Sequence, residues 1–387
     1  MILHDLISFE MLRLIWWFLM GVMLIAFAMT DGFDMGVGAL LPFAGKTDRE
    51  RRVIINTVGP VWEGNQVWFI LGGALIFAAW PMLYAISFSG FYFAMFLILA
   101  ALILRPVAFK YRSKREDPAW RSRWDWALFI GGAAPALLFG VAVGNVLLGL
   151  PFHLTPDLVA MPDTGPLMRF LGLLNPFSLL CGVVSLALLV AHGAGWLVLK
   201  TTGAVQSRAR KFGERAALVA LLGYLLAGLW LAFGIEGFHY AAPILHDGPS
   251  NPLIHPVTRS ASWLLAYSER PWITIAPVLG LAGCLISWLA LRSGRELAPL
   301  LGTKLAIFGM ISSVGLVMFP VILPSATDPA SSLTVWNASS SHLSLFVMLV
   351  AACFFLPLIM IYTAWVYRVL WGKVSEDDVD DPELHSY

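Results

Sequence analysis

Long runs of apolar residues dominate the chain, each close to the ~20 residues that cross a bilayer as a helix. Short segments richer in charge, Gly and Pro separate them. The runs lie approximately at residues 12–42, 54–79, 82–107, 124–149, 169–199, 213–235, 271–292, 302–323 and 342–371. Backbone polar groups in lipid must be satisfied within their own segment, so each run is expected to be helical. The pattern predicts an all-α integral membrane protein with nine transmembrane helices.

The composition agrees with a membrane protein and does not indicate a nucleic-acid-binding protein. The 387 residues are 59% hydrophobic and 13% charged, with a mean hydropathy of +0.78, whereas soluble domains are about half apolar. The formal net charge of +1 and the scatter of basic residues between the runs do not indicate a nucleic-acid partner. Residues 1–387 are therefore interpreted as a single polytopic membrane domain in contact with lipid.

Most basic residues are expected on one side of the membrane. With nine helices and alternating connections, all but four of the 25 Lys and Arg residues fall on the same side; the exceptions are Arg13, Arg169, Arg259 and Arg270. Basic residues favour the cytoplasmic side. The N-terminus is therefore expected in the periplasm and the C-terminus in the cytoplasm. An even number of spans would destroy this bias.

The connections carry two further expectations. The outer segments 150–168, 236–270 and 324–341 are rich in Pro, Gly, Ser and Asn, which predicts short ordered caps without a soluble domain. Only Trp80-Pro81 separates the second run from the third. This corner predicts a tight antiparallel hairpin between those two helices.

Acidic residues within the apolar runs are the strongest candidates for function. Asp31 and Asp34 lie in the first run and Glu63 in the second, although a charge at such depth costs at least about 3 kcal/mol. At ~1.5 Å per residue, the aspartates lie about 30 Å along their helix and Glu63 about 13 Å along the next. With the N-terminus outside, all three approach one level near the cytoplasm. Interleaved glycines at 32, 36 and 38 allow a neighbouring helix to come close.

Three interpretations of these acids remain open from the residues alone. With Asn65 and Gln66 nearby, they suit a proton-entry path from the cytoplasm, because water and carboxylates can exchange protons there. The same residue types suit a site for a coupling cation. They also suit helix packing, with the acids protonated or paired with Arg105. The spacing does not separate these three.

Histidine and tryptophan add little chemistry of their own. His192 is a lone histidine inside a run, with no second ligand three or four residues away, so a hydrogen-bonded packing role is favoured and no metal ligand is assigned. Tryptophans at the ends of runs fit interfacial belts. Trp62 and Trp68 lie deeper and are candidates for lining a cleft open to a quinone or to dioxygen.

A series of motifs follows in order along nearly the whole chain. They occupy residues 30–38, 62–68, 78–81, 88–92, 105–114, 144–145, 150–152, 175–177, 318–320, 333–336 and 339–341. Together they resemble subunit II of the cytochrome bd-type ubiquinol oxidases. A likeness this long and this ordered is highly specific.

The resemblance implies a respiratory complex in the bacterial cell inner membrane. The chain would pair with a larger subunit I that carries two b-type hemes, one d-type heme and the quinol site. That complex couples quinol oxidation to reduction of dioxygen to water and generates proton motive force without pumping protons. The resemblance also implies two four-helix bundles plus one additional helix, no heme ligand in this subunit, a structural ubiquinone held by some members, and small single-helix accessory subunits.

The resemblance further implies roles for individual residues. Protons consumed in water formation come from the cytoplasm, and Asp31 and Asp34 match the two acids of the family's first-helix motif on that route. Glu63 stands where the family pattern has aspartate, which keeps the acid but lengthens it. Arg105 matches an arginine suited as their counter-charge, and Trp68 lies near the implied oxygen route. The alternatives are an ion-coupled secondary transporter and a purely structural scaffold of the oxidase.

Overall fold

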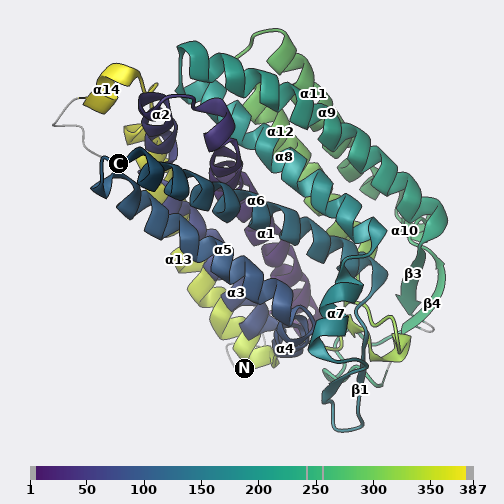
Figure 1. Ribbon diagram of the computed structural model, residues 1–387. Helices are drawn as coiled ribbons and strands as arrows, with labels where there is room; N and C mark the ends of the chain where they lie inside the picture. The colour runs from purple at the N-terminus through teal and green to yellow at the C-terminus, as the bar shows by residue number, and fades with distance from the viewer. Residues whose placement is uncertain (1–5, 241–242, 255–256, 381–387) are drawn as a thin grey trace.

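Long helices lying side by side make up most of the molecule (Figure 1). A computed structural model describes residues 6–240, 243–254 and 257–380. Its α-helices are α1 (Phe9–Ala44), α2 (Asp48–Val58), α3 (Trp62–Ala79), α4 (Pro81–Gly90), α5 (Tyr92–Tyr111), α6 (Pro118–Leu148), α7 (Pro166–Leu173), α8 (Pro176–Lys200), α9 (Gly203–Gly234), α10 (Leu265–Glu269), α11 (Ile275–Arg292), α12 (Ala298–Met318), α13 (His342–Val369) and α14 (Glu376–Asp380). Short 3-10 turns occur at η2 (Arg112–Lys114), η3 (Pro271–Thr274) and η4 (Pro329–Ser331).

Short strands structure the connections at one end of the helices. Antiparallel pairs form between β1 (Phe152–Leu154) and β2 (Ala160–Pro162), β3 (Glu236–Tyr240) and β4 (Val257–Ser262), and β5 (Val321–Leu323) and β6 (Leu333–Thr334). These pairs give the connections the order expected of caps, although the sequence pattern did not predict strands. We call this the strand end, and the opposite end, with α2 and α14, the α2 end (Figure 1).

The number of spans is close to the predicted nine. Eight of the described helices are long and apolar enough to cross a membrane. The helices α3 and α4 pass the same test only together, as a pair bent by 119°, and the count then reaches nine. The chain is therefore a multi-pass membrane protein.

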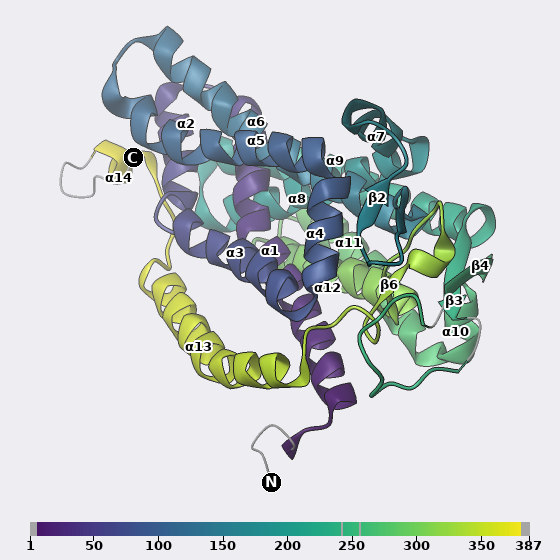
Figure 2. The same ribbon diagram turned by 90° about the horizontal axis from the view of Figure 1, so that it is seen from below.

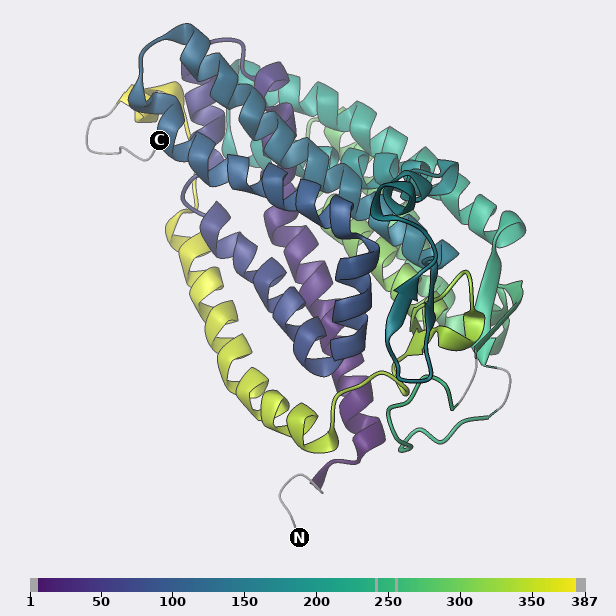
Figure 3. The same ribbon diagram turned by 60° about the horizontal axis from the view of Figure 1, so that its bottom comes forward.

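The helices pack differently in the two halves of the chain. In the second half α8, α9, α11 and α12 form a closed ring of four helices. In the first half the main contacts run in series from α3 to α1, α6 and α5, while α13 packs on α1 and α3 (Figures 2 and 3). The expected division into two four-helix bundles plus one helix is not confirmed.

The corner at Trp80-Pro81 does not make the predicted tight hairpin. Pro81 is the first residue of α4, where its missing N–H costs nothing. The helix α4 then carries the chain away from α3, and a second bend at Phe91 starts α5 (Figure 2). The hairpin prediction was wrong because the ten-residue helix α4 lies between the corner and α5, so α3 does not turn directly into the next long helix.

The predicted span 54–79 is also two helices. Gly59 and Pro60 interrupt it, since Pro60 has no N–H to continue the helical hydrogen bonds. The helix α2 starts at a capping box between Thr47 and Glu50. Burial alone would raise the pKa of Glu50, but hydrogen bonds from Arg208 and two backbone N–H groups lower this pKa below its ordinary value. These contacts fix α2 at the end of the molecule.

Ion pairs connect α2 to the segment between α5 and α6. Arg112 binds Asp48 at 2.8 Å and Asp125 at 2.5 Å, and Arg51 binds Asp125 at 2.8 Å. Arg112 and Asp125 are each only 1% exposed, so their charges are shielded from solvent and mutually compensated. The network holds α2 beside the ends of α5 and α6.

Glycines allow α1 to approach α8 at backbone distance. A Cβ atom at Gly36 would overlap the carbonyl oxygen of Leu189, and one at Gly193 would overlap the backbone of Gly36. Only hydrogen atoms fit at this crossing, which is the close approach that small residues permit between membrane helices. The prediction that the glycines after Asp31 admit a neighbouring helix is confirmed.

Replacing Gly36 with alanine is expected to lower the thermal unfolding temperature by several degrees, since forcing atoms into a filled crossing costs about 1–3 kcal/mol. The matched control is Gly21→Ala on the same helix, where a Cβ meets nothing within 4 Å. Thermal unfolding of the protein purified in detergent compares the two variants. Equal unfolding temperatures would contradict the close crossing.

Candidate functional site

Four helices, α1, α3, α5 and α13, bring polar side chains together in one buried cluster. The helix α1 contributes Asp31 and Asp34, α5 contributes Arg105, α3 contributes Asn65, and α13 contributes Tyr367. The exposed fractions of Asp31, Asp34, Arg105 and Asn65 are 1%, 4%, 2% and 1%. This cluster is therefore closed off by protein within the chain itself.

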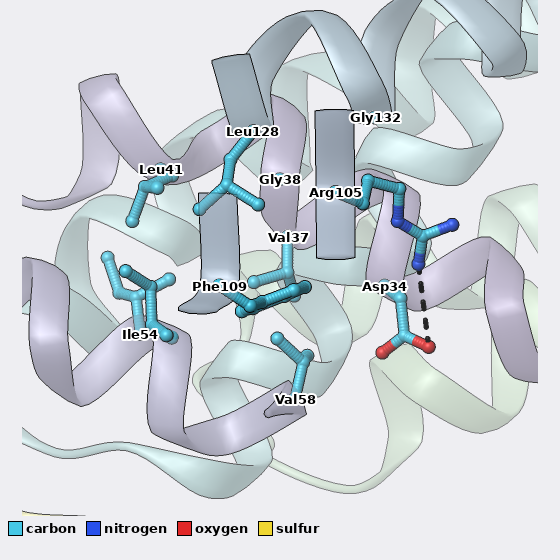
Figure 4. A pocket seen from close by; sticks show the side chains of 11 residues that line it. Asp34, Val37, Gly38, Leu41, Ile54, Val58, Arg105, Phe109, Leu128 and Gly132 are labelled. Carbon is cyan, nitrogen blue, oxygen red and sulfur yellow. Dashed lines mark ion pairs between the residues drawn. The ribbon is translucent and has the colours of Figure 1, made fainter. Parts of the chain in front are cut away.

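Arg105 forms a two-pronged ion pair with only one of the aspartates. Its Nη1 and Nη2 donate to the two carboxylate oxygens of Asp31 at 2.9 and 2.7 Å, while Nη2 lies 4.0 Å from Oδ2 of Asp34 (Figure 4). Gly131 of α6 leaves room for the stem of Arg105, because a Cβ there would lie 2.7 Å from Cγ. Bidentate pairs are the strongest arginine–carboxylate contacts. Asp31 is thus fully engaged.

Asp34 has a different set of neighbours. The amide nitrogen of Asn65 donates to Oδ2 of Asp34 at 2.7 Å, and the hydroxyl of Tyr367 donates to Oδ1 of Asn65 at 2.6 Å. Oδ1 of Asp34 is buried without a hydrogen-bond partner among the described groups. One oxygen of this carboxylate is therefore free to carry a proton.

The charges of the cluster do not balance when both acids are ionised. Two carboxylates, Asp31 and Asp34, face the single guanidinium of Arg105. An uncompensated charge in a buried site costs several kcal/mol. A proton on Asp34 removes the imbalance and leaves the Arg105–Asp31 pair intact. The geometry thus allows Asp34 to take up and release one proton.

A small cavity adjoins Asp34. Its volume is about 10 Å³, close to the smallest space that holds one water molecule. Figure 4 shows Asp34 and Arg105 at one end of the cavity and apolar side chains at the other, including Ile54 and Val58 of α2 and Phe109 of α5. The cavity extends from the acid toward α2.

Glu63 does not join this cluster in the structure. It lies in the first turn of α3, because that helix begins at Trp62 and not near residue 54, and its side chain is exposed. Residues two apart on a helix do not share a face, so Glu63 points elsewhere than Asn65. The expectation that Glu63 lies beside the two aspartates was therefore wrong. Asp31, Asp34 and Arg105 do come together as predicted.

The family of this chain is decided by comparison with known proteins. A family model described as cytochrome bd terminal oxidase subunit II matches residues 12–370. The chain belongs to this family. The likeness stated from its motifs is thereby confirmed, and as a subunit II of a bd oxidase it is one part of an oxidoreductase complex that contains hemes and pairs with a subunit I.

Full-length relatives support the assignment. The cytochrome bd-I ubiquinol oxidase subunit 2 of Escherichia coli K12 and a probable cytochrome oxidase subunit 2 of Haemophilus influenzae are each 45% identical over 375 residues, which covers 97% of this chain and 98% of theirs. A bd ubiquinol oxidase subunit 2 from Bacillus subtilis is 31% identical over 379 residues, with the same coverage.

A solved structure shares the fold. The bd oxidase of Geobacillus thermodenitrificans contains a chain that matches with a TM-score of 0.65 at 15% identity, covering 92% of this chain and 98% of the other. At this identity the match supports the fold alone. It agrees with a helical multi-pass membrane subunit.

The tryptophans proposed for a cleft are both buried in this subunit II. Trp62 is 3% exposed and stacks on Phe109, with ring centroids 5.2 Å apart. Trp68 is 6% exposed and packs in an apolar cluster with Met23 and Leu75. The indole nitrogens of both tryptophans are buried without a hydrogen-bond partner among the described groups.

His192 has the packing role expected of it. Its Nε2 donates to the carbonyl of Met29 at 3.0 Å, and its Nδ1 lies 2.8 Å from the hydroxyl of Thr303. Both ring nitrogens therefore have hydrogen-bond partners within the chain. Within the described residues no group of three His, Cys, Asp or Glu side chains could hold a metal ion.

Tyr367 belongs to the site although no sequence pattern predicted it. An aromatic residue near the end of an apolar run is typical of an interfacial belt, and nothing in the sequence connects position 367 with position 65. The nearest indication was the amide of Asn65, which needed partners if buried. The contact follows only from the packing of α13 beside α3.

Removal of the counter-charge is expected to disrupt assembly. Arg105→Met leaves two buried carboxylates unpaired, at a cost of about 3–5 kcal/mol, so the yield of heme-containing complex from membranes should fall severely. Adding Asp31→Asn to that variant should restore part of the yield. The control is Lys110→Met, an exposed position on the same helix, which should assemble normally. Equal yields for Arg105→Met and the control would contradict this account.

Proposed function

We propose that this subunit II carries the cytoplasmic proton-entry path of a bacterial inner-membrane oxidase that oxidises a quinol and reduces dioxygen to water. The α2 end faces the cytoplasm in this arrangement. The two b-type hemes and the d-type heme, held by subunit I, supply electron transfer and oxygen reduction. The residues of this chain hold and move protons, and the complex generates proton motive force without pumping.

The observation that carries this proposal is the imbalance at Asp34. Asp31 is matched by the two-pronged contact with Arg105, so the pair neutralises itself and contributes to helix packing. Asp34 has one unpartnered oxygen and borders a cavity large enough for about one water. A buried acid that can be neutral or charged beside water is suited to pass protons.

Glu63 has a separate place in the proposed path. Its carboxylate is exposed at the start of α3, at the positive end of the helix dipole, which favours a negative charge. We assign it the role of an acid at the surface of this chain, with Asp34 as the buried acid. Protons would pass between them by way of water.

The competing function is that of a structural scaffold. The bidentate contact of Arg105 with Asp31 favours it for those two residues, since they join α1 to α5. A scaffold does not require the unpaired acid at Asp34. The scaffold function therefore concerns Asp31, and the proton-path function concerns Asp34. Substitution of Asp34 tests the proton path without breaking the Arg105–Asp31 pair.

Asp34→Asn is expected to slow quinol-driven oxygen uptake by about ten-fold or more; the roughly 10²–10⁴-fold contribution of a positioned acid or base is the upper guide. Glu63→Gln should slow it less, because water can bypass an exposed group. Oxygen electrode measurements on the purified two-subunit complex provide the rates, and heme absorbance confirms assembly.

The matched control is Glu116→Gln, an exposed acid between α5 and α6, which should leave uptake unchanged. Normal uptake by fully assembled Asp34→Asn complex would show that this aspartate serves packing alone. A slowed rate with full heme content supports the proton path.

We also propose that dioxygen passes this subunit near Trp68, which belongs to an apolar cluster with Met23 of α1 and Leu75 of α3. Trp62, in a separate apolar cluster with Phe109, is the weaker candidate for the oxygen route, and a quinone bound in this subunit is the weaker alternative to dioxygen. Trp68→Leu should change the KM for dioxygen about two-fold or more while the rate at saturating dioxygen stays near wild type. The control is Trp365→Leu, 60% exposed on α13. An unchanged KM would remove Trp68 from the route.

A further inference from the structure

Tyr367 is a polar link from an otherwise exposed helix into the buried cluster. Of the described residues of α13, only Leu345 and Phe346 are buried, and both lie near the opposite end of the helix from Tyr367. The Tyr367 ring is half-buried and meets Phe33 and Trp196 edge-on, with centroids 6.4 and 6.1 Å apart. Its hydroxyl enters the cluster that contains Asp34.

The hydroxyl sets the orientation of a buried amide. An asparagine side chain presents an acceptor on one side and two donors on the other. Because Tyr367 donates to Oδ1 of Asn65 at 2.6 Å, Nδ2 is turned toward Asp34, to which it donates at 2.7 Å. With the opposite orientation, the carbonyl of Asn65 would face the carboxylate and repel it when ionised.

This orientation distinguishes the two oxygens of Asp34. Oδ2 accepts from Asn65 and is also the oxygen nearest Arg105, at 4.0 Å. Oδ1 has no partner among the described groups. Hydrogen bonds to one oxygen stabilise negative charge there, so a proton arriving at the carboxylate binds Oδ1.

We propose that Tyr367 is a positioning residue for the proton-transferring acid: through Asn65 it directs proton uptake by Asp34 to Oδ1. The inference rests on the proposed proton path through Asp34. In addition, α13, which packs on α3, influences Asp34 through the single hydrogen bond from Tyr367 to Asn65. A loss of this bond changes how readily Asp34 is protonated without removing any charged group.

The groups that face Asp34 come from several helices. Asp31 lies on its own helix, Arg105 comes from α5, and Tyr367 from α13, while α3 contributes only the neutral amide of Asn65. On α8, His192 packs beside Gly32 and Phe33 of α1, and its ring nitrogens contact Met29 and Thr303. The residues of α2 and α6 at the adjoining cavity are apolar or glycine. Tyr367→Phe leaves all these charges in place.

The test is the pH profile of oxygen uptake by the intact oxidase complex carrying Tyr367→Phe. Without the hydroxyl the amide of Asn65 can rotate, so the ionised form of Asp34 loses support and protonation is favoured. The alkaline limb of the profile should move to higher pH by about half a unit or more, and the maximal rate should fall about five-fold, as expected for the loss of ~1 kcal/mol. Tyr362→Phe, 59% exposed on the same helix, should keep both the profile and the rate.

A second variant shows whether Tyr367 acts through Asn65. Asn65→Leu removes the amide, so adding Tyr367→Phe to it should change neither the profile nor the rate further. Independent, additive effects of the two substitutions would overturn the inference, as would a wild-type profile for assembled Tyr367→Phe when Asp34→Asn is slow. If Asp34→Asn itself is as fast as wild type, the proton path and this inference both fall.

Discussion

The buried pair between Arg105 and Asp31 determines the character of the whole site. Its two short contacts satisfy one carboxylate completely, and the guanidinium then lies 4.0 Å from the other. A symmetric arrangement would have shared the positive charge and left both acids half-compensated. The observed asymmetry instead divides two neighbouring aspartates into a structural anion and an acid with a free oxygen.

Close backbone packing makes this pair possible. The helix α1 approaches α8 at Gly36 and Gly193, and a Cβ at Gly132 of α6 would overlap the carbonyl of Met35. Such contacts help to bury the acids between helices, so their charges lie in a medium where pairing is strong and an unpaired charge is costly. The glycines and the acids of the first-helix motif therefore serve one arrangement.

The sequence predicted the parts of this site that depend on local pattern. Most apolar runs, the acids at depth, the small residues and the Arg105 counter-charge follow from hydropathy and electrostatics, whereas the breaks that divide the runs 54–79 and 82–107 were missed. Glu63 and Tyr367 were not located correctly, because their directions depend on where α3 begins and on how α13 packs. The break at Gly59 and Pro60 determines where α3 begins and therefore which of its residues face the interior. The periodicity of a uniformly apolar run does not reveal this.

The placement of Glu63 and Asn65 constrains how a proton can reach the cluster. They lie two residues apart on α3, one exposed and one buried, and the buried Asn65 is the one that contacts Asp34. The cavity beside Asp34 runs toward Ile54 and Val58 of α2. In the proposed path, water from the α2 end would reach Asp34 beside α2, the short helix that the Arg112 and Asp125 ion pairs hold in place. On that proposal, access to the buried acid would depend on α2 more than on a continuous line of carboxylates.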